Sequence, residues 1–252
     1  LLVLLSHAKK RIVSFRIKTR SKFRTRFYNE FVPHRMRDMH TVDYHLALLA
    51  PLGASEASRA VQLTLPKSAR EKATDLLEAK SIRRGFVIFH PGTARAEKFW
   101  NAQRWAEVIN HAGDKHGLDL VITGGTSPLE HTHIGDIKAK VRHRVIDLSG
   151  RTDLLTLAAL IAKARLLVTV DSAPVHLASA SRTPQVILFG PTNPFHWRPL
   201  ESPALILHGD STAPVTEFVA KQPRLAMNQI STEAVIDAME TLLSAPATSP
   251  RS

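Results

Sequence analysis

The chain has 252 residues, of which 44% are apolar, and its net charge is +12. This length allows one large or two small domains, and the apolar content is enough for a core. The absence of cysteine excludes disulfides, cysteine nucleophiles and thiolate metal sites. No apolar run approaches the ~20 residues of a membrane span, and the apolar start is too short for a signal-peptide core. Because the chain starts with Leu and not Met, we expect it to be the remainder of a longer protein.

The positive charge is concentrated near the start of the chain. Residues 1–40 carry a net charge of +9, and the other 212 residues carry only +3. Within "RIKTRSKFRTR" every second residue is cationic, and in an extended chain this period puts six cations on one side. Repulsion between them favours a bound polyanion, either nucleic acid or phosphorylated lipid, although a solvated basic loop is an equal alternative. The six cations are Arg16, Lys18, Arg20, Lys22, Arg24 and Arg26.

The first 80 residues do not complete a fold of their own. The pattern predicts a strand over 11–16 and helices over 40–53 and 67–80, which together cannot bury a separate core. We therefore interpret 1–55 as the end of an upstream domain and 56–81 as a connector.

From residue 82 onward, short apolar runs alternate with helical patterns. The runs do not alternate in polarity and are bounded by turn residues, as in parallel strands that are buried on both faces. This predicts an α/β fold with a doubly wound parallel sheet, over 82–230. A helix over 231–245 starts at Ser231, and 246–252 reads as a disordered tail. The six predicted strands cover 85–90, 118–123, 144–149, 165–170, 184–189 and 203–208.

Ligands of doubly wound sheets bind beyond the carboxyl ends of the strands, so the loops there are candidate sites. In "HPGTARAEKFW", Thr93, Arg95 and Lys98 precede an expected helix start, a combination that suits a diphosphate. A helix cap with surface charges is the alternative. In "GGTSPLE", Gly124 and Gly125 allow close approach of a ligand, and Glu130 could accept hydrogen bonds from a ribose. A plain turn is the alternative there.

The stretch "VDSAPVHLASAS" places Asp171, Ser172 and His176 close together, and these are the residue types of a hydrolase triad. The acid and the serine are adjacent and no glycine precedes the serine, which disfavours a nucleophile elbow. Ser172 or Ala173 is expected to cap a helix whose first turn holds Pro174. An acidic strand tip for sugar hydroxyls, beside a helix N-terminus for phosphate, fits this pattern better. In the following "GPTNPFHWRP" loop, the prolines either hold the shape of a pocket or only pin a connection.

Several common site motifs are absent from the sequence. It contains no G-x-G-x-x-G and no G-x-x-x-x-G-K-[ST], which argues against a dinucleotide enzyme and a P-loop enzyme. The thirteen histidines form no recognisable metal motif, so we predict no metal site. His131 and His133 are expected to be exposed residues of a helix.

The motifs "HPGTARAEKFWNAQRWAEVI", "ITGG" and "LSGRTDLLTLAALIAKARLLVTVDSAPVHLASASRTPQVILFGPTNPFHWRP", taken in order, resemble glycosyltransferase family 9, the lipopolysaccharide heptosyltransferases. The resemblance is strong over residues 80 to 200. It implies a GT-B architecture, in which two Rossmann-like domains face each other and the second holds the nucleotide sugar. It also implies an inverting transfer from ADP-heptose without an obligatory metal or other cofactor.

The resemblance further implies roles for individual residues. Thr93 and Lys98 would contact the donor diphosphate, and Asp171 would hold heptose hydroxyls. Ser172, Ala173 and His176 would line the phosphate side. Glu130 would lie near the ribose, beside Gly124 and Gly125, and the loop from Gly150 to Thr152 near the base.

Two departures from the family pattern matter. Ala173 stands where the family usually has glycine, so the turn must avoid positive φ or accept strain. The family's general base, an aspartate, belongs to a segment that this chain lacks, so the catalytic residue is unassigned and we predict no transfer by this chain alone.

The acceptor that the resemblance implies is the phosphorylated lipid A-core at the cytoplasmic face of the inner membrane of a Gram-negative-type bacterium. The six cations of 16–26 could attract it, with peripheral membrane contact. Two alternatives remain open: a GT-B nucleotide-sugar enzyme with another donor, and a non-catalytic anion-binding module. Nucleic acid is not expected as a partner, because only Phe23, Phe27 and Tyr28 lie among the cations as stacking residues.

Overall fold

The computed structural model describes residues 2–54 and 58–245. The chain divides into two compact units. The first contains the chain up to Arg59 together with two later segments, Phe195–Arg198 and Val219–Gln222. The second contains Ala60–Pro194, Pro199–Phe218 and the chain from Pro223 onward.

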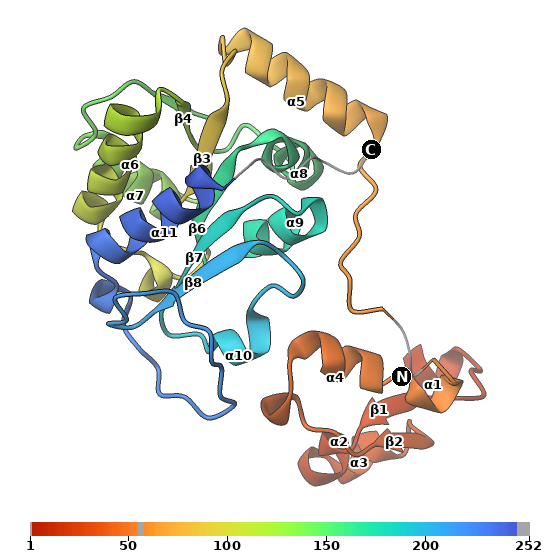
Figure 1. The fold of residues 1–252 in the computed structure, drawn as a ribbon. Helices are drawn as coiled ribbons and strands as arrows, with labels where there is room; N and C mark the ends of the chain where they lie inside the picture. The colour runs from red at the N-terminus through yellow and green to blue at the C-terminus, as the bar shows by residue number, and fades with distance from the viewer. Residues whose placement is uncertain (1, 55–57, 246–252) are drawn as a thin grey trace. The chain divides into compact units, whose positions relative to one another are not determined.

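The second unit is built on a six-stranded parallel sheet with the strand order β5-β4-β3-β6-β7-β8 (Figure 1). All six predicted strands are present, and the predicted doubly wound α/β fold is confirmed. The chain starts in the middle of the sheet, moves outward to β5, and then returns to β6 on the other side of β3. The strands are β3 (Phe86–His90), β4 (Asp119–Ile122), β5 (Val145–Asp147), β6 (Leu166–Val170), β7 (Gln185–Phe189) and β8 (Ala204–His208).

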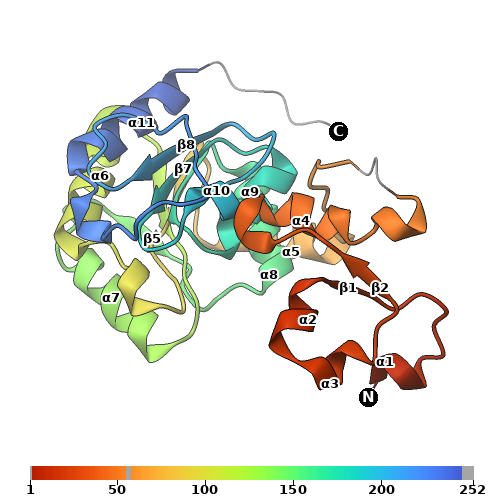
Figure 2. The ribbon, with the colours of Figure 1, turned by 90° about the horizontal axis from the view of Figure 1, so that it is seen from below.

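Helices cover both faces of this sheet, as both ribbon views show (Figures 1 and 2). Val87 and Phe89 point into a core with Trp105, whereas Ile88 points into a second core with Ala159 on the opposite face. Because both faces are buried, apolar side chains are favoured at every strand position, which explains the unbroken apolar runs. The first face carries α6 (Ala102–His116), α7 (Pro128–Lys138) and α11 (Thr232–Ser244); the second carries α5 (Lys67–Ala79), α8 (Leu154–Lys163) and α9 (Ala173–Ser181).

Part of the segment interpreted as a connector belongs to the second unit. Ala73 of α5 and Ile82, which follows this helix, are buried in the core that α8 also lines. At the other end, Ser231 accepts a hydrogen bond from the Ala234 N–H and caps α11, as the sequence predicts. The predicted tail, 246–252, lies outside the described residues.

The first unit contains a small parallel pair, β1 (Ile12–Ser14) and β2 (Glu30–Val32). The predicted strand is shorter than expected, and the helix predicted over 40–53 is divided into α4 (Thr41–Ala47) and a 3₁₀ turn that ends at Gly53, where φ is +78°. Few of the described residues of the first unit are buried. The other elements of the chain are α1 (Leu2–Leu5), α2 (Arg16–Arg20), α3 (Lys22–Thr25), α10 (Pro194–Trp197) and the 3₁₀ turns η1 (Met36–Asp38), η2 (Ala50–Leu52), η3 (Ala96–Lys98) and η4 (Met227–Gln229).

The extended conformation considered for the basic run is wrong. Arg16–Arg20 and Lys22–Thr25 are helical, and only Ser21 between them is extended, with φ −159°. The physical reason is local: the Ser21 hydroxyl accepts a hydrogen bond from the Arg24 N–H and so caps the second helix. In helices, residues four apart share a face, so the cations do not form one row.

Among the described residues, no helix is both long and apolar enough to cross a membrane. In the same part of the chain, no three potential metal ligands of the His, Cys, Asp or Glu type come together.

Candidate functional site

A buried ion pair joins the loops that follow β3 and β6. Lys98 Nζ donates to the Asp171 carboxylate over 2.6 Å and to the Asp171 main-chain oxygen over 3.1 Å. The two side chains are only 13% and 10% exposed. The strands β3 and β6 are neighbours, but their following helices α6 and α9 cover opposite faces, so this is the switch point of the sheet. Ligands of doubly wound folds bind at such a point.

The loop after β3 leads into a helix, as predicted. The helix α6 begins at Ala102, after the turn η3, and Asn101 accepts hydrogen bonds from its first amides. The α6 N-terminus is therefore already capped. Thr93 is buried, whereas Arg95 forms an exposed pair with Glu97. Thr93 and Lys98 are thus the two polar groups that this loop holds within the protein.

Glu130 lies in the first turn of α7 and is only 8% exposed. A Cβ added to Gly92 would lie 2.5 Å from Glu130 Oε1, and one added to Gly125 would lie 2.2 Å from Oε2. The carboxylate therefore fits between two loops because both positions lack a side chain. Ser127 supports it, since its hydroxyl donates to Glu130 Oε2 over 3.2 Å.

His90, the last residue of β3, is a buried polar residue that no motif of the sequence indicated. Its Nδ1 lies 2.8 Å from the Thr123 hydroxyl, at the end of the neighbouring strand β4. Burial lowers the pKa of His90 to about 4, so the ring is neutral at pH 7. The available sequence signal was one titratable residue at the end of an otherwise apolar strand.

The start of α9 is open on its N-terminal side. Ser172 holds the capping position with an extended backbone, but its hydroxyl donates to the Val170 carbonyl over 3.3 Å and does not cap the helix. The predicted capping position is therefore correct, although the Ser172 hydroxyl does not bond to the helix amides. The non-glycine residues with positive φ in the described structure do not include Ala173, so the departure from glycine costs no strain. Amides at a helix N-terminus attract anions. In the first turn of α9, Pro174 has no N–H and the Val175 N–H donates to the Ser172 carbonyl over 3.1 Å, so of these three residues Ala173 is the one that offers its N–H to an anion.

Three histidines near the candidate loops, His176 of α9 and His131 and His133 of α7, differ in their exposure. His176 of α9 is exposed at its surface, and partial loss of hydration lowers its pKa, while the Asp171 charge opposes the shift. His131 is exposed as predicted. The same prediction is wrong for His133, which is half-buried and stacks on Phe99 with ring centroids 4.3 Å apart.

The loop predicted near the base adjoins the glycine pair. Gly150, whose φ is +68°, donates its N–H to the Gly124 carbonyl over 2.9 Å. Thr152 follows it and is half-buried. The structure thus joins the predicted donor residues in two local groups: Gly124, Gly125 and Glu130 with the Gly150 loop, and Lys98 with Asp171.

Comparison with known proteins identifies the family to which this constellation belongs. Residues 1–225 match the family model described as glycosyltransferase family 9 (heptosyltransferase). The chain belongs to glycosyltransferase family 9. The sequence resemblance is therefore confirmed over most of the chain.

Relatives and solved structures agree with this family assignment. The chain is 30% identical to lipopolysaccharide heptosyltransferase 3 of Escherichia coli K12 over 206 residues, which cover 81% of the chain and 60% of that relative. A family 9 structure from Veillonella parvula superposes with a TM-score of 0.75 at 26% identity, covering 86% of this chain and 64% of the other. The E. coli ADP-heptose lps heptosyltransferase II shares the fold, with a TM-score of 0.70 at 20% identity. This superposition covers 95% of this chain and 71% of the other. The chain thus spans about three fifths of the length of the E. coli K12 relative.

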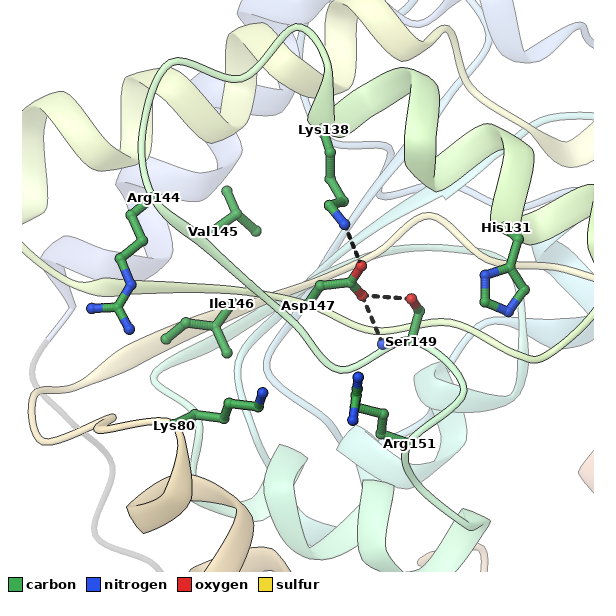
Figure 3. Close-up of a pocket in the computed structure, with 9 residues that line it drawn as sticks. All are labelled: Lys80, His131, Lys138, Arg144, Val145, Ile146, Asp147, Ser149 and Arg151. Atoms are coloured by element: carbon green, nitrogen blue, oxygen red, sulfur yellow. Dashed lines mark hydrogen bonds and ion pairs between the residues drawn. The ribbon is translucent and has the colours of Figure 1, made fainter.

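This family 9 chain also has a basic hollow of about 450 Å³ along the edge strand β5 (Figure 3). Asp147 lies at its centre, where Lys138 donates to it over 2.6 Å and Ser149 donates from its N–H over 2.9 Å. Arg151, from the loop predicted near the base, lines the hollow, whereas Lys98 and Asp171 are not among the described residues of its lining. The hollow is therefore distinct from the Lys98–Asp171 pair. Its lining residues are Lys80, His131, Lys138, Arg144, Val145, Ile146, Asp147, Ser149 and Arg151.

Proposed function

We propose that the second unit binds ADP-heptose and that the chain supplies the donor half of an inverting heptosyltransferase. The observation that carries the proposal is the Lys98–Asp171 pair at the switch point of the sheet. Family membership supports it, and the E. coli ADP-heptose lps heptosyltransferase II shares the fold.

In this proposal the donor replaces part of the ion pair with its own contacts. Lys98 and the main-chain amides of Ser172 and Ala173 at the start of α9 meet the diphosphate, whose charge grows when the bond to the heptose breaks. Asp171, held by Lys98 and by its own N–H bond to the Leu188 carbonyl, accepts hydrogen bonds from heptose hydroxyls. His176, whose pKa is lowered by partial burial, offers a ring nitrogen for a hydrogen bond on the phosphate side.

The nucleoside occupies the neighbouring loops in the same proposal. Glu130 lies near the ribose, and the loop from Gly150 to Thr152 lies near the base. No general base is assigned among the 252 residues, so we expect the purified chain to bind the donor without completing a transfer. The acceptor is the phosphorylated lipopolysaccharide inner core, which the cations of 16–26 attract at the cytoplasmic face of the membrane.

Donor binding is tested by calorimetry, with ADP-heptose compared with UDP- and GDP-sugars. We expect binding of ADP-heptose only, and an affinity at least about tenfold lower for Lys98→Ala and for Asp171→Ala, because each loses a charge-assisted contact. Lys72→Ala is the matched control, since Lys72 forms an exposed pair with Asp153 at 3.4 Å. Binding of another nucleotide sugar but not ADP-heptose would show that the donor assignment is wrong. Unchanged ADP-heptose affinity in both site variants would show that Lys98 and Asp171 do not form the donor site.

A further inference from the structure

The edge strand β5 is paired on one side only. It forms a parallel ladder with β4, and no described segment of the chain pairs with its other side. At the opposite edge of the sheet the chain covers β8, since the Val215 N–H donates to the Ile206 carbonyl over 2.8 Å. The basic hollow of about 450 Å³ lies along β5 (Figure 3). The two edges of the sheet thus differ, and the one beside the hollow is open.

The main chain of β5 offers hydrogen bonds at this open edge. The N–H groups of a strand point alternately to its two sides, and the Leu148 N–H donates to the Ile122 carbonyl of β4 over 2.8 Å. The N–H groups of Val145 and Asp147 therefore point away from β4. Unpaired main-chain groups at a sheet edge form a template for another extended strand.

Three cations beside the edge have no side-chain partner in the part of the chain that the structure describes. Lys138 is neutralised, because its Nζ donates to the Asp147 carboxylate over 2.6 Å. The side chains of Lys80, Arg144 and Arg151 line the same hollow without a described hydrogen bond or ion pair. Figure 3 shows Lys80 and Arg151 extending toward each other. The open edge is therefore bordered by uncompensated positive charge.

The free cations come from elements that belong to one face of the sheet. Lys80 caps the end of α5, and Arg151 lies in the loop that leads into α8. Arg144 precedes β5 directly, two residues before Ile146, which packs in the core that α5 and α8 cover. Lys138 ends α7, on the other face. Side chains of a strand alternate between the faces, so every second residue of an added strand would meet the free cations.

Charge selects the kind of strand that fits this edge. A second copy of the chain, paired through β5, would bring the same cations together, and charged side chains at an edge disfavour such pairing. Carboxylates at every second position of a partner strand would form charge-assisted hydrogen bonds with them. The three residues of β5 span about 10 Å and so match three or four residues of a partner.

We propose that the open edge of β5 binds an extended acidic segment of a partner protein. The segment adds a strand to the sheet through the main chain of Val145 and Asp147. Its carboxylates, one at every second residue, face Lys80, Arg144 and Arg151. This interface is a further function of the second unit and does not depend on the proposed transfer reaction.

A fluorescent hexapeptide that alternates glutamate with threonine is the probe for the full chain. Two matched control peptides carry N-methyl groups either on the glutamates or on the threonines, which leaves the charge unchanged. Only every second N–H of a strand faces its neighbour, so we expect one control to bind at least about tenfold more weakly and the other to change about threefold or less. Equal affinities of all three peptides would show attraction by charge alone and overturn strand addition.

Two charge-matched variants test the cations. K80Q/R144Q and R83Q/R84Q each remove two positive charges, and Arg83 and Arg84 are exposed and absent from the described lining of the hollow. We expect the first variant to bind the probe at least about tenfold more weakly and the second to change about twofold or less. Equal losses would overturn the site. Circular dichroism checks the fold, and R144Q and R84Q give the same comparison if the first variant does not fold.

Amide hydrogen exchange locates the bound strand. The probe should slow exchange at Val145 and Asp147 and leave Ile146 unchanged, because the Ile146 N–H already faces β4. Slower exchange only at other residues would overturn the assignment to β5. Displacement of the probe by a tighter-binding single-stranded oligonucleotide would overturn the proposal in favour of nucleic acid. A dimer of the chain that the probe dissociates would overturn it in favour of a second copy.

ADP-heptose binding separates this inference from the proposed function. It should be unchanged in K80Q/R144Q, because neither residue is a proposed donor contact. A wild-type chain that binds ADP-heptose but not the probe would overturn only the strand-binding edge.

Discussion

Lys98 Nζ lies 2.6 Å from Asp171 Oδ2 and joins two loops that are 73 residues apart in the chain. The pair exists because β6 returns to lie beside β3, so that the ends of both strands meet at one edge of the sheet. With little exposure to water, each charge depends on the other for its solvation. This relationship affects stability as well as binding.

We expect Lys98→Met to lower the free energy of unfolding of the donor-free protein by about 1.5–3 kcal/mol, the range for a hydrogen bond to a charged group. The variant leaves the Asp171 carboxylate without its partner, so Lys98→Met/Asp171→Asn should lose less than the sum of the single changes. Urea unfolding of the four proteins measures this coupling. Lys72→Ala, which breaks an exposed pair, should cost at most about 1 kcal/mol. Additive losses in the double variant would contradict a coupled pair.

The narrow space around Glu130 gives a second prediction. In Gly125→Ala, the new methyl group would lie 2.2 Å from Glu130 Oε2, so the carboxylate must move. We expect donor affinity to fall by about tenfold or more, while the unfolding free energy falls by about 1–3 kcal/mol, as for overpacking. Calorimetry and urea unfolding measure the two effects separately.

Gly135 of α7 is the matched control for this substitution. A Cβ there would meet nothing within 4 Å, and the residue lies inside the helix. Gly135→Ala should therefore stabilise the protein by about 0.5–1 kcal/mol and leave donor binding unchanged. In a Glu130→Ala background, Gly125→Ala should lose most of its effect on the unfolding free energy, because the carboxylate that it displaces is gone. An undiminished effect in that background would show that Glu130 is not the group displaced.

His90 gives a prediction of pH dependence. Burial lowers its pKa from 6.5 to about 4, so the unfolded chain binds the proton more readily than the folded one. The stability that this shift contributes is complete above pH 6.5 and is lost as the pH falls to about 4. The loss amounts to about 3 kcal/mol for a shift of this size. Urea unfolding at several pH values measures it.

His90→Phe should flatten the stability profile between pH 6.5 and 4, because it removes the titrating group. The exposed His131, changed to Gln, should leave the profile as in the wild type. If the slope in this pH window is the same in His90→Phe and in the wild type, another group is responsible for it.

The parallel strands could be predicted because their burial on both faces leaves a direct trace in the sequence. In β3, Phe86 to Phe89 are all apolar, and the short length of this run between turn residues, with its aromatic and β-branched side chains, favours a buried strand over a helix. The cap at Ser231 could be predicted for a similar reason, since a helix start depends on its immediate neighbours. The family motifs could also be recognised from the sequence, because each of them lies in a loop that directly follows a predicted strand.

Contacts between distant segments could not be read in this way. The sequence shows Lys98 and Asp171 as loop residues, but only the adjacency of β3 and β6 brings them within 2.6 Å. Likewise, His133 looks like a surface residue of a helix until packing places it on Phe99.

The basic run shows the same division between local pattern and tertiary structure. Its composition by itself establishes six cations in eleven residues, and therefore an affinity for anions. Whether these cations form one row or two groups depends on the backbone conformation. The hydrogen bond from the Arg24 N–H to the Ser21 hydroxyl caps α3 and so favours a helix there over an extended chain. Alternation in a strand and periodicity in a helix distribute the same residues differently, so only the folded chain decides that Arg16, Arg20 and Arg24 share a hollow.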